Sequence, residues 1–305
     1  MLSVLTGAGF QCLCVFYLVI LATIIDFYSP FDKGVYIGLT ASIFPFLGLF
    51  NGFTSARIYT FFNGSNWVML AAATSTFLPF IIGGSFIFID LLEGFERDVH
   101  KIMPAYEALT MFLLWLLVHI PFNLFGTLIG FYLTKIQPPT KANRVPRDAP
   151  KAYQLPWYMR DGVLALVVGA IPVAVIIFEI KLILDSINGA ENIHMISWFM
   201  YFAFALFLVV AVQLAIIVNY ALLCYEEYRW WWKIWTYGAG SGFFIFLATI
   251  NYLLYDLDVD TYTTLITYWI SCALVSSMVG LMTGSACLLS AFKFNLFLYD
   301  SVKSD

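Results

Sequence analysis

Long runs of apolar residues, separated by short polar stretches, dominate the sequence from end to end. A helix needs roughly 20 apolar residues to cross the hydrocarbon core of a bilayer. Eight runs approach or exceed that length, at about 2–25, 35–54, 67–89, 105–134, 162–186, 195–224, 234–255 and 262–298. The pattern predicts an all-α fold, a polytopic membrane helical bundle with about eight transmembrane helices.

The polar stretches between these runs are short, with one exception. Residues 135–161 are rich in Pro, Lys and Arg, which predicts an exposed loop, and residues 299–305 form a short polar tail. The rest of the chain fits one transmembrane domain, 1–305. The first apolar run starts at Leu2 without a basic segment before it or a small-residue cleavage site after it, which favours a membrane helix over a signal peptide.

Composition supports the membrane assignment and excludes other classes of protein. The chain of 305 residues is 62% hydrophobic and 11% charged, whereas a soluble domain is about 45–50% apolar and about 25% charged. The net charge of −4 offers no basic surface for nucleic acid. The five cysteines have no disulfide or zinc-site spacing, so their expected role is packing.

Charged residues are divided unequally between the two sides of the predicted bundle. With eight crossings, 11 of the 15 Lys and Arg residues fall on the side of both termini and of the 135–161 loop. On the other side fall 13 of the 19 Asp and Glu residues. Basic residues mark the cytosolic side of a membrane protein. We therefore predict that both termini are cytosolic, with membrane lipid around the spans.

Ionisable residues inside predicted spans are costly and mark candidate functional positions, foremost among them His119 and Glu179. His119 lies two residues before Pro121, which can break or kink a helix. His119 is therefore either a proton relay or substrate contact at a broken helix, or a histidine hydrogen-bonded to a neighbouring helix. Glu179 is either a cation or proton site, or an acid bonded to a neighbouring helix near the lumenal interface. Lys181 and Asp185 are four residues apart and can pair on one helix face. The sequence leaves these alternatives open.

Two uncharged polar residues, Gln213 and Asn219, lie in the sixth predicted span, where we expect interhelical hydrogen bonds. No nucleophile–base set, zinc-protease motif or phosphate-binding loop occurs, and the three histidines lie in different segments. The sequence therefore predicts that the protein is not an enzyme, with no catalytic, cofactor-binding or metal site.

Three motifs together point to one family. The first, CYEEYRWWWKIW (224–235), places an acid pair before three consecutive tryptophans at a membrane border, as expected of an interface anchor. The second is NGFTSARIYTFFNGSNW (51–67), and the third is the C-terminal LYDSVKSD (298–305). On these motifs the sequence resembles the nonaspanins, the transmembrane 9 superfamily, along its whole length. The motif residues of interest are Glu226, Glu227, Tyr228, Arg229, Trp230, Trp231 and Trp232 in the first, and Ser55, Ala56, Arg57 and Tyr59 in the second.

The resemblance implies a location and a role. The family has a lumenal N-terminal domain and nine spans, and the match begins at the second span, so the domain and first span are expected to lie outside this sequence. Family members are Golgi and endosomal proteins linked to sorting of other membrane proteins, particularly clients with glycine-rich transmembrane helices. Lys303 and Asp305 match the family signal that binds COPI-type coat subunits; without the family context they would be an ordinary charged tail.

Two functions of different kinds follow as hypotheses. A sorting factor would recognise client helices laterally, in a groove for which residues 238–242 (GAGSG), Gln213 and Asn219 are candidates. A multi-pass transporter or channel for a small solute or cation would instead use helices broken at proline, with His119 and Glu179 as its polar groups.

Overall fold

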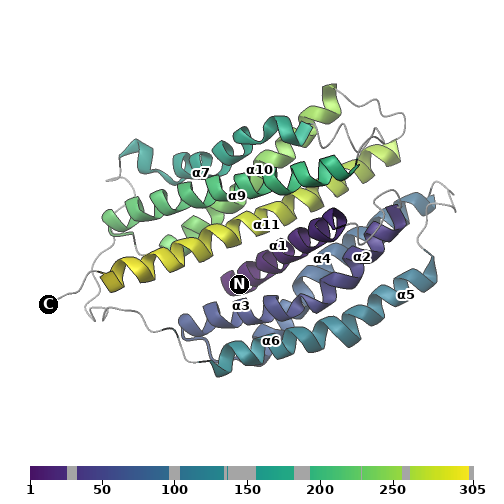
Figure 1. Cartoon of the computed structure of the whole chain (residues 1–305), viewed down its shortest axis with the longest axis horizontal. Coiled ribbons are helices and arrows are strands. Elements are labelled where there is room, and N and C mark those ends of the chain that lie inside the picture. Colours follow the sequence, from purple (N-terminus) through teal and green to yellow (C-terminus); the bar gives the residue numbers. More distant parts are fainter. Residues whose placement is uncertain are drawn as a thin grey trace.

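Long apolar helices run side by side through the molecule, which is a computed structural model (Figure 1). The structure describes residues 1–25, 33–95, 104–133, 136, 156–181, 193–227, 229–255 and 262–301. Within these ranges the chain forms helices, turns and connecting segments, without a β-strand. The all-α helical bundle predicted from the apolar runs is confirmed.

The helices follow the order of the apolar runs along the chain. Seven helical segments of the described residues are long and apolar enough to cross a membrane, with α2 and α3 counted as one segment and α5 to α6 as another. The elements are α1 (Leu2–Ile24), α2 (Lys33–Phe46), α3 (Gly48–Phe61), α4 (Trp67–Phe95), α5 (Ala105–Leu114), η1 (Trp115–His119), α6 (Ile120–Tyr132), η3 (Trp157–Met159), α7 (Asp161–Val175), α9 (Ile193–Cys224), α10 (Trp230–Tyr255) and α11 (Tyr262–Ser301).

The bounds of two predicted spans differ most from those in the structure. The segment predicted over 162–186 contains α7, a shorter apolar helix that ends at Val175, and a further helical turn over 177–181. Residues 182–192 lie outside the described part of the chain. The span predicted over 35–54 continues as α3 to Phe61, because residues beyond 54 keep a buried face against the bundle. Most of the 135–161 loop also lies outside the described residues.

Two of the long segments are interrupted near their middles. Pro45, which has no amide hydrogen to donate, lies inside α2, and the chain breaks at Leu47 before α3 begins. Between α5 and α6, the five residues of η1 form a π-helical turn, which is followed by Pro121. A Cβ atom on Gly48 would lie 2.8 Å from His119 Nδ1, so the two interruptions are neighbours.

Glycine lets several of these helices approach backbone to backbone. A Cβ atom on Gly52 of α3 would overlap the Asn123 carbonyl oxygen of α6, and one on Gly126 of α6 would overlap the Leu49 carbonyl oxygen. At the bundle centre, a Cβ atom on Gly9 of α1 would overlap the Leu281 carbonyl oxygen of α11. Small residues at such crossings are typical of membrane helix pairs, which gain van der Waals contact and short interhelical bonds by close approach.

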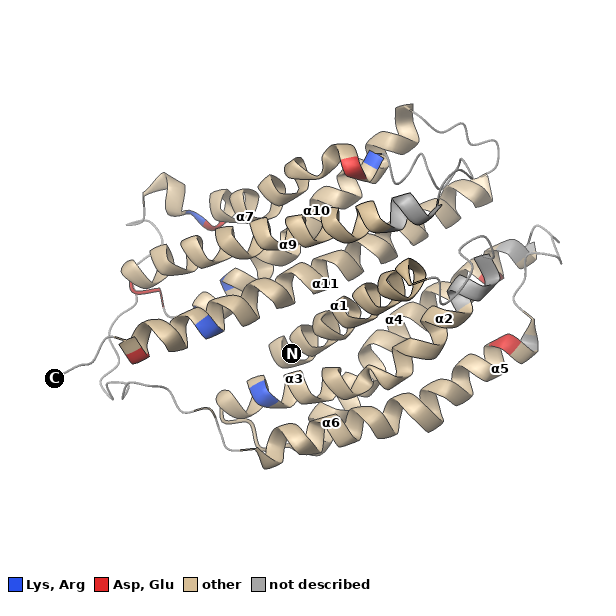
Figure 2. Cartoon of the chain, in the orientation of Figure 1, with Lys and Arg blue, Asp and Glu red and all other residues tan. Residues whose placement is uncertain are grey.

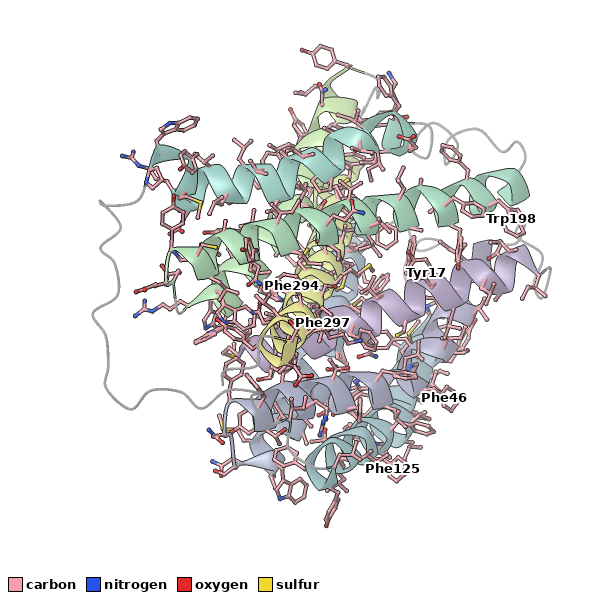
Figure 3. All side chains as sticks on the ribbon, turned by 60° about the vertical axis from the view of Figure 1, so that its left-hand side comes forward. Tyr17, Phe46, Phe125, Trp198, Phe294 and Phe297 are labelled. Atoms are coloured by element: carbon pink, nitrogen blue, oxygen red, sulfur yellow. The ribbon has the colours of Figure 1, made fainter. Side chains whose placement is uncertain are left out.

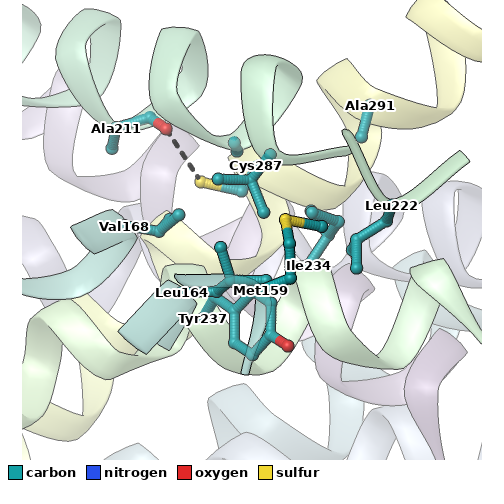
Figure 4. Packing of buried hydrophobic residues seen from close by; sticks show 11 residues of the cluster. Met159, Leu164, Val168, Ala211, Leu222, Ile234, Tyr237, Cys287 and Ala291 are labelled. Carbon is teal, nitrogen blue, oxygen red and sulfur yellow. Dashed lines mark hydrogen bonds between the residues drawn. The ribbon is translucent and has the colours of Figure 1, made fainter. Parts of the chain in front are cut away.

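The largest apolar cluster joins α7, α9, α10 and α11 (Figure 4). Val168, Ile234 and Cys287 are fully buried in it, and the Cys287 thiol lies 3.6 Å from the Ala211 carbonyl oxygen. A second cluster joins α1, α4 and α11 around Ala8, and it also receives the Trp235 side chain from α10. The second cluster therefore connects α1 and α4 with α10 and α11.

The outer surface divides into an apolar middle and charged ends. Figure 2 shows the charged residues of the described part gathered toward two ends of the bundle, with uncharged helix between them. In Figure 3, Phe46 and Phe125 point outward, and both side chains are about half exposed, at 50% and 59%. An apolar, aromatic-rich belt between charged ends is the surface expected of a protein that spans a membrane.

Candidate functional site

The tryptophan-rich motif forms a corner held together by ion pairs. Glu227, in the connection between α9 and α10, accepts a hydrogen bond from Lys233 Nζ at 2.8 Å and one from the backbone amide of Arg229 at 3.2 Å. Lys233 also pairs with Asp161 at the start of α7, at 2.9 Å, and the Tyr237 hydroxyl donates to the same carboxylate oxygen at 2.6 Å. The motif therefore fixes how α7 and α9 meet the start of α10.

The environment of Asp161 changes its acidity. Partial burial acts to raise the pKa of this carboxyl group, but hydrogen bonds from Tyr237 and Lys233, together with the Lys233 charge, more than offset it. The net result is a pKa below the ordinary value of 3.8. The pair is charged at neutral pH, and it links two helix ends beside the membrane rather than forming a site for proton exchange near pH 7.

The tryptophans also connect the first motif to the second. The Trp231 ring meets Phe62, just past the end of α3, edge to face at 5.3 Å between ring centroids. In the second motif, Ser55 and Ala56 are fully buried, and Tyr59 packs against Phe131 of α6 at 6.1 Å. Arg57 is partly exposed near the end of α3. The two motifs thus lie close together at one end of the bundle.

Buried polar side chains form a series of hydrogen bonds among α1, α2, α3, α4 and α6. Gln11 of α1 donates to the Phe44 carbonyl oxygen of α2 at 2.9 Å. Asn51 of α3 donates to Gln11 Oε1 at 3.0 Å and to the Thr74 carbonyl oxygen of α4 at 3.2 Å. The Thr74 hydroxyl in turn donates to Asn123 Oδ1 of α6 at 2.8 Å. These bonds link five helices through groups that lipid could not satisfy.

His119 lies at the end of this polar chain, at the π-helical turn. Its side chain is fully buried, and its ring stacks on Phe44 with the centroids 5.4 Å apart and the planes 11° from parallel. Within the described residues, neither ring nitrogen has a hydrogen-bond partner, and neither does Asn123 Nδ2. The ring therefore stacks on Phe44 and lies against the backbone of Pro45 in α2, and both sequence alternatives for His119 stay predictions.

The other polar residues predicted inside spans have different surroundings. Asn219 of α9 donates to Asn295 Oδ1 of α11 at 2.6 Å, an interhelical bond within the bundle. Gln213 is exposed on α9, so an interhelical role for it would need a partner outside the described residues. Glu179 has one buried carboxylate oxygen without a partner in the described part of the chain, and Asp185 lies outside that part.

The glycines of GAGSG (238–242) face neighbouring helices of the same chain. A Cβ atom on Gly238 would lie 2.9 Å from the Cys287 thiol of α11, and one on Gly242 would lie 2.9 Å from Gly280 Cα. Gly240 faces α7, where it opposes Gly169. The segment is thus a crossing point for three helices, and it is largely covered from inside the protein.

Next to this crossing, a groove of about 440 Å³ lies between α4 on one side and α10 and α11 on the other. Phe77 and Ile81, near the middle of α4, form one wall. The floor is made of small residues of α10 and α11, and the rim includes Phe243, whose side chain is 60% exposed. The floor residues are Ala239, Gly242, Ala273, Ser276, Ser277 and Gly280.

Two polar groups of this groove lack hydrogen-bond partners. The Ser276 side chain is only 4% exposed, and its hydroxyl has no partner within the described residues. The Trp235 indole nitrogen is likewise shielded and unpartnered there. By contrast, the hydroxyl of the adjacent Ser277 donates to the Leu274 carbonyl oxygen of its own helix at 2.7 Å. Leaving a buried polar group without a partner costs about 1–3 kcal/mol.

Some of the residues singled out from the sequence cannot be located in the structure. Tyr228, Lys303 and Asp305 lie outside the described residues. Within the described ranges, no cluster of three or more His, Cys, Asp or Glu side chains has the arrangement of a metal site.

The polar residues that the sequence analysis missed are single polar positions inside apolar runs, above all Gln11, Asn51, Thr74 and Ser276. Gln11 and Asn51 were detectable on that ground, because large amides are costly there.

Comparisons with known proteins agree on one family. A family model described as Endomembrane protein 70 matches residues 1–262. The chain is 28% identical to human Transmembrane 9 superfamily member 4 over 305 residues, which is all of this chain and 47% of the human protein. It is 26% identical to Transmembrane 9 superfamily member 8 of Arabidopsis thaliana, covering all of this chain and 46% of that protein. The chain thus spans a little under half the length of these relatives, and no solved structure matches it.

Proposed function

The chain belongs to the Endomembrane protein 70 family, and we propose that it sorts other integral membrane proteins in Golgi and endosomal membranes. The observation that carries the proposal is the groove between α4, α10 and α11, with its floor of small residues at mid-helix level. Membrane helices associate through such small-residue surfaces, because the backbones can approach closely and exchange hydrogen bonds. The groove therefore suits a client helix rich in glycine.

The C-terminal tail supplies the second part of the proposal. α11 continues to Ser301, and Figure 2 shows basic positions of α3 and α11 toward that end of the bundle. A basic end favours the cytosol. Lys303 and Asp305 would then present a cation beside carboxylates to a COPI-type coat subunit, with both termini cytosolic.

The test of sorting uses membrane reporters that differ only in their single span, one glycine-rich and one leucine-rich. Delivery of each reporter to the cell surface is measured with and without the full chain. Sorting predicts that delivery of the glycine-rich reporter changes selectively. Equal delivery of both reporters would refute it.

The tail is tested separately by localisation. Combined Lys303→Ala and Asp305→Ala substitutions are expected to move the protein out of the Golgi, while Ser304→Ala, the matched control between them, leaves it there. Unchanged localisation of the double variant would remove the coat-binding assignment and leave the groove proposal standing.

One observation favours the alternative function, a transporter or channel. His119 is buried without hydrogen-bond partners in the described chain, beside two interrupted helices, α2–α3 and α5–α6. Interrupted helices line the substrate sites of many transporters. Purified full chain in liposomes would then carry a cation or solute flux that His119→Phe or Glu179→Gln abolishes. Absence of flux with a panel of monovalent cations and protons would remove the cation version of this alternative.

A further inference from the structure

Four aromatic rings join the ends of α3, α10 and α11 at the end of the bundle that carries the tryptophan-rich motif. Phe61 of α3 meets Phe292 of α11 edge to face, with 4.7 Å between the ring centroids. Phe62 meets Trp231 of α10 edge to face at 5.3 Å, and Phe61 and Phe62 contact each other at 5.4 Å. The Phe62 side chain is 40% exposed, so this aromatic cluster reaches the surface of the bundle.

Three basic side chains lie beside the aromatic cluster, one near each of the three helix ends. Arg57 lies one helical turn before the rings of α3, on the same face as Phe61. Arg229 lies two residues before Trp231, and Lys293 directly follows the ring supplied by α11. Arg229 and Lys293 are exposed and Arg57 is partly exposed, so a ligand at the surface can reach all three cations. Figure 2 shows basic positions of α3 and α11 toward this end.

The acidic side chains described at this end leave the three cations in excess. Glu227 and Asp161 both pair with Lys233, at 2.8 Å and 2.9 Å, and these pairs account for the charge of Lys233. Glu226 is exposed in the connection between α9 and α10. Asp300 lies about two turns beyond the basic residue of α11, roughly 10 Å further along that helix. The surface next to the aromatic rings is therefore positive and suits an anion.

The donors of the two arginines are numerous enough for a ligand as well as for the protein. Arg57 and Arg229 also interact within the chain. A guanidinium group has five N–H donors in a planar fork that matches the oxygens of a phosphate. Lys293 adds an ammonium group with three further donors. The three side chains can therefore bind one phosphate from different sides.

We propose that Arg57, Arg229 and Lys293, around the aromatic cluster, bind the headgroup phosphate of an anionic phospholipid. A lipid is favoured over a soluble anion because aromatic rings at the ends of membrane helices lie at headgroup level. Anionic lipids are enriched in the cytosolic leaflet, the side that we expect this end of the bundle to face. A headgroup bound there joins the ends of α3, α10 and α11. The inference does not depend on the sorting function.

The binding experiment counts the lipids that stay on the purified full chain in native mass spectrometry. The chain is taken from micelles that contain phosphatidylserine or phosphatidylcholine with the same acyl chains. We expect phosphatidylserine to be retained about three- to tenfold more strongly, because each basic side chain at a membrane surface strengthens binding of an anionic lipid several-fold. Added salt should weaken this preference by screening, whereas glycerophosphoserine, the soluble headgroup, should not displace the lipid.

Protein variants assign the preference to the three cations. Lys293→Gln is expected to lower it about threefold, and the combined Arg57→Gln, Arg229→Gln and Lys293→Gln variant is expected to lose it. Arg160→Gln is the matched control, because it removes an exposed cation before α7, away from the aromatic cluster. Unfolding midpoints in phosphatidylcholine show whether each variant is folded. Phosphatidylserine should raise the midpoint of the unchanged chain but not that of the combined variant.

The outcomes decide between this site and a general effect of charge. Equal retention of the two lipids, or a preference that the combined variant keeps, would overturn the inference. An equal loss in Arg160→Gln would also overturn it, since net charge rather than this surface would then select the lipid. Displacement by glycerophosphoserine would assign the surface to a soluble anion. If the combined variant does not fold, Lys293→Gln decides, and an unchanged preference in that variant would refute the proposal.

Discussion

Gly9 offers the sharpest test of how the bundle is packed. In the structure, a methyl group at this position of α1 would overlap the Leu281 carbonyl oxygen and the Ser285 hydroxyl of α11. A carbonyl oxygen in a helix backbone cannot rotate away, so Gly9→Ala must push α1 from α11. Overpacking of this kind costs about 1–3 kcal/mol. The Ser285 hydroxyl, which donates to the Leu5 carbonyl oxygen at 3.4 Å, would lose that bond as well.

The matched control for this substitution is Gly83→Ala in α4. A Cβ atom there would meet nothing within 4 Å, and alanine favours the helix over glycine by roughly 0.5–1 kcal/mol. Unfolding midpoints of both variants, purified in the same detergent, are the measurement. We expect a lower midpoint for Gly9→Ala and an equal or higher one for Gly83→Ala. Equal midpoints for the two variants would refute the close α1–α11 contact on which the packing argument depends.

Three further predictions follow from the same bundle. Asn51→Leu removes hydrogen bonds to two other helices and leaves their groups buried, so it should cost about 1–3 kcal/mol of stability, measured by detergent unfolding. Asp161→Asn should cost less than about 1 kcal/mol, since the Asp161 side chain is 66% exposed and solvent screens its pair with Lys233. Because the pKa of Asp161 is lowered in the fold, its contribution to stability is present above its ordinary pKa and is lost as the pH falls through the lowered value. The variant should lack this loss of stability in acid. Trp231→Ala should cost about 0.5–1.5 kcal/mol through its lost ring contact with Phe62, and crosslinking between cysteines placed at the ends of α3 and α10 should fall.

The apolar runs predicted the helices because membrane helices must be long and apolar whatever they pack against. Seven described segments meet that requirement. Each of them corresponds to one predicted apolar run, and the segment that contains α3 differs most from its run. The extension of α3 to Phe61 was missed because its last residues are mixed in polarity. Their burial depends on contacts with other helices, such as the packing of Tyr59 on Phe131, that the local sequence does not contain.

The candidate groups were harder to predict than the helices. Large polar residues inside spans can be found in the sequence, and one of them, Asn219, forms the interhelical hydrogen bond expected of it. The partners of Gln11, Asn51 and Thr74 were not visible, because pairing depends on how helices far apart in sequence are arranged. Ser276 gave no signal at all, since serine and threonine often bond to their own helix, as Ser277 does. Only the three-dimensional arrangement separates the unpartnered serine from its neighbour.

The contact between α1 and α11 has a consequence for how the protein is made. The two helices meet through residues such as Leu5 and Ser285, which are 280 residues apart in the chain. At synthesis rates of about 5–20 residues per second, α1 waits roughly 15–55 s after it leaves the ribosome before its partner exists. Gln11 of α1 has a partner much sooner, because Asn51 of α3 follows only 40 residues later. The residues of a polar contact between α1 and α3 are therefore all synthesised well before the last helix of the bundle.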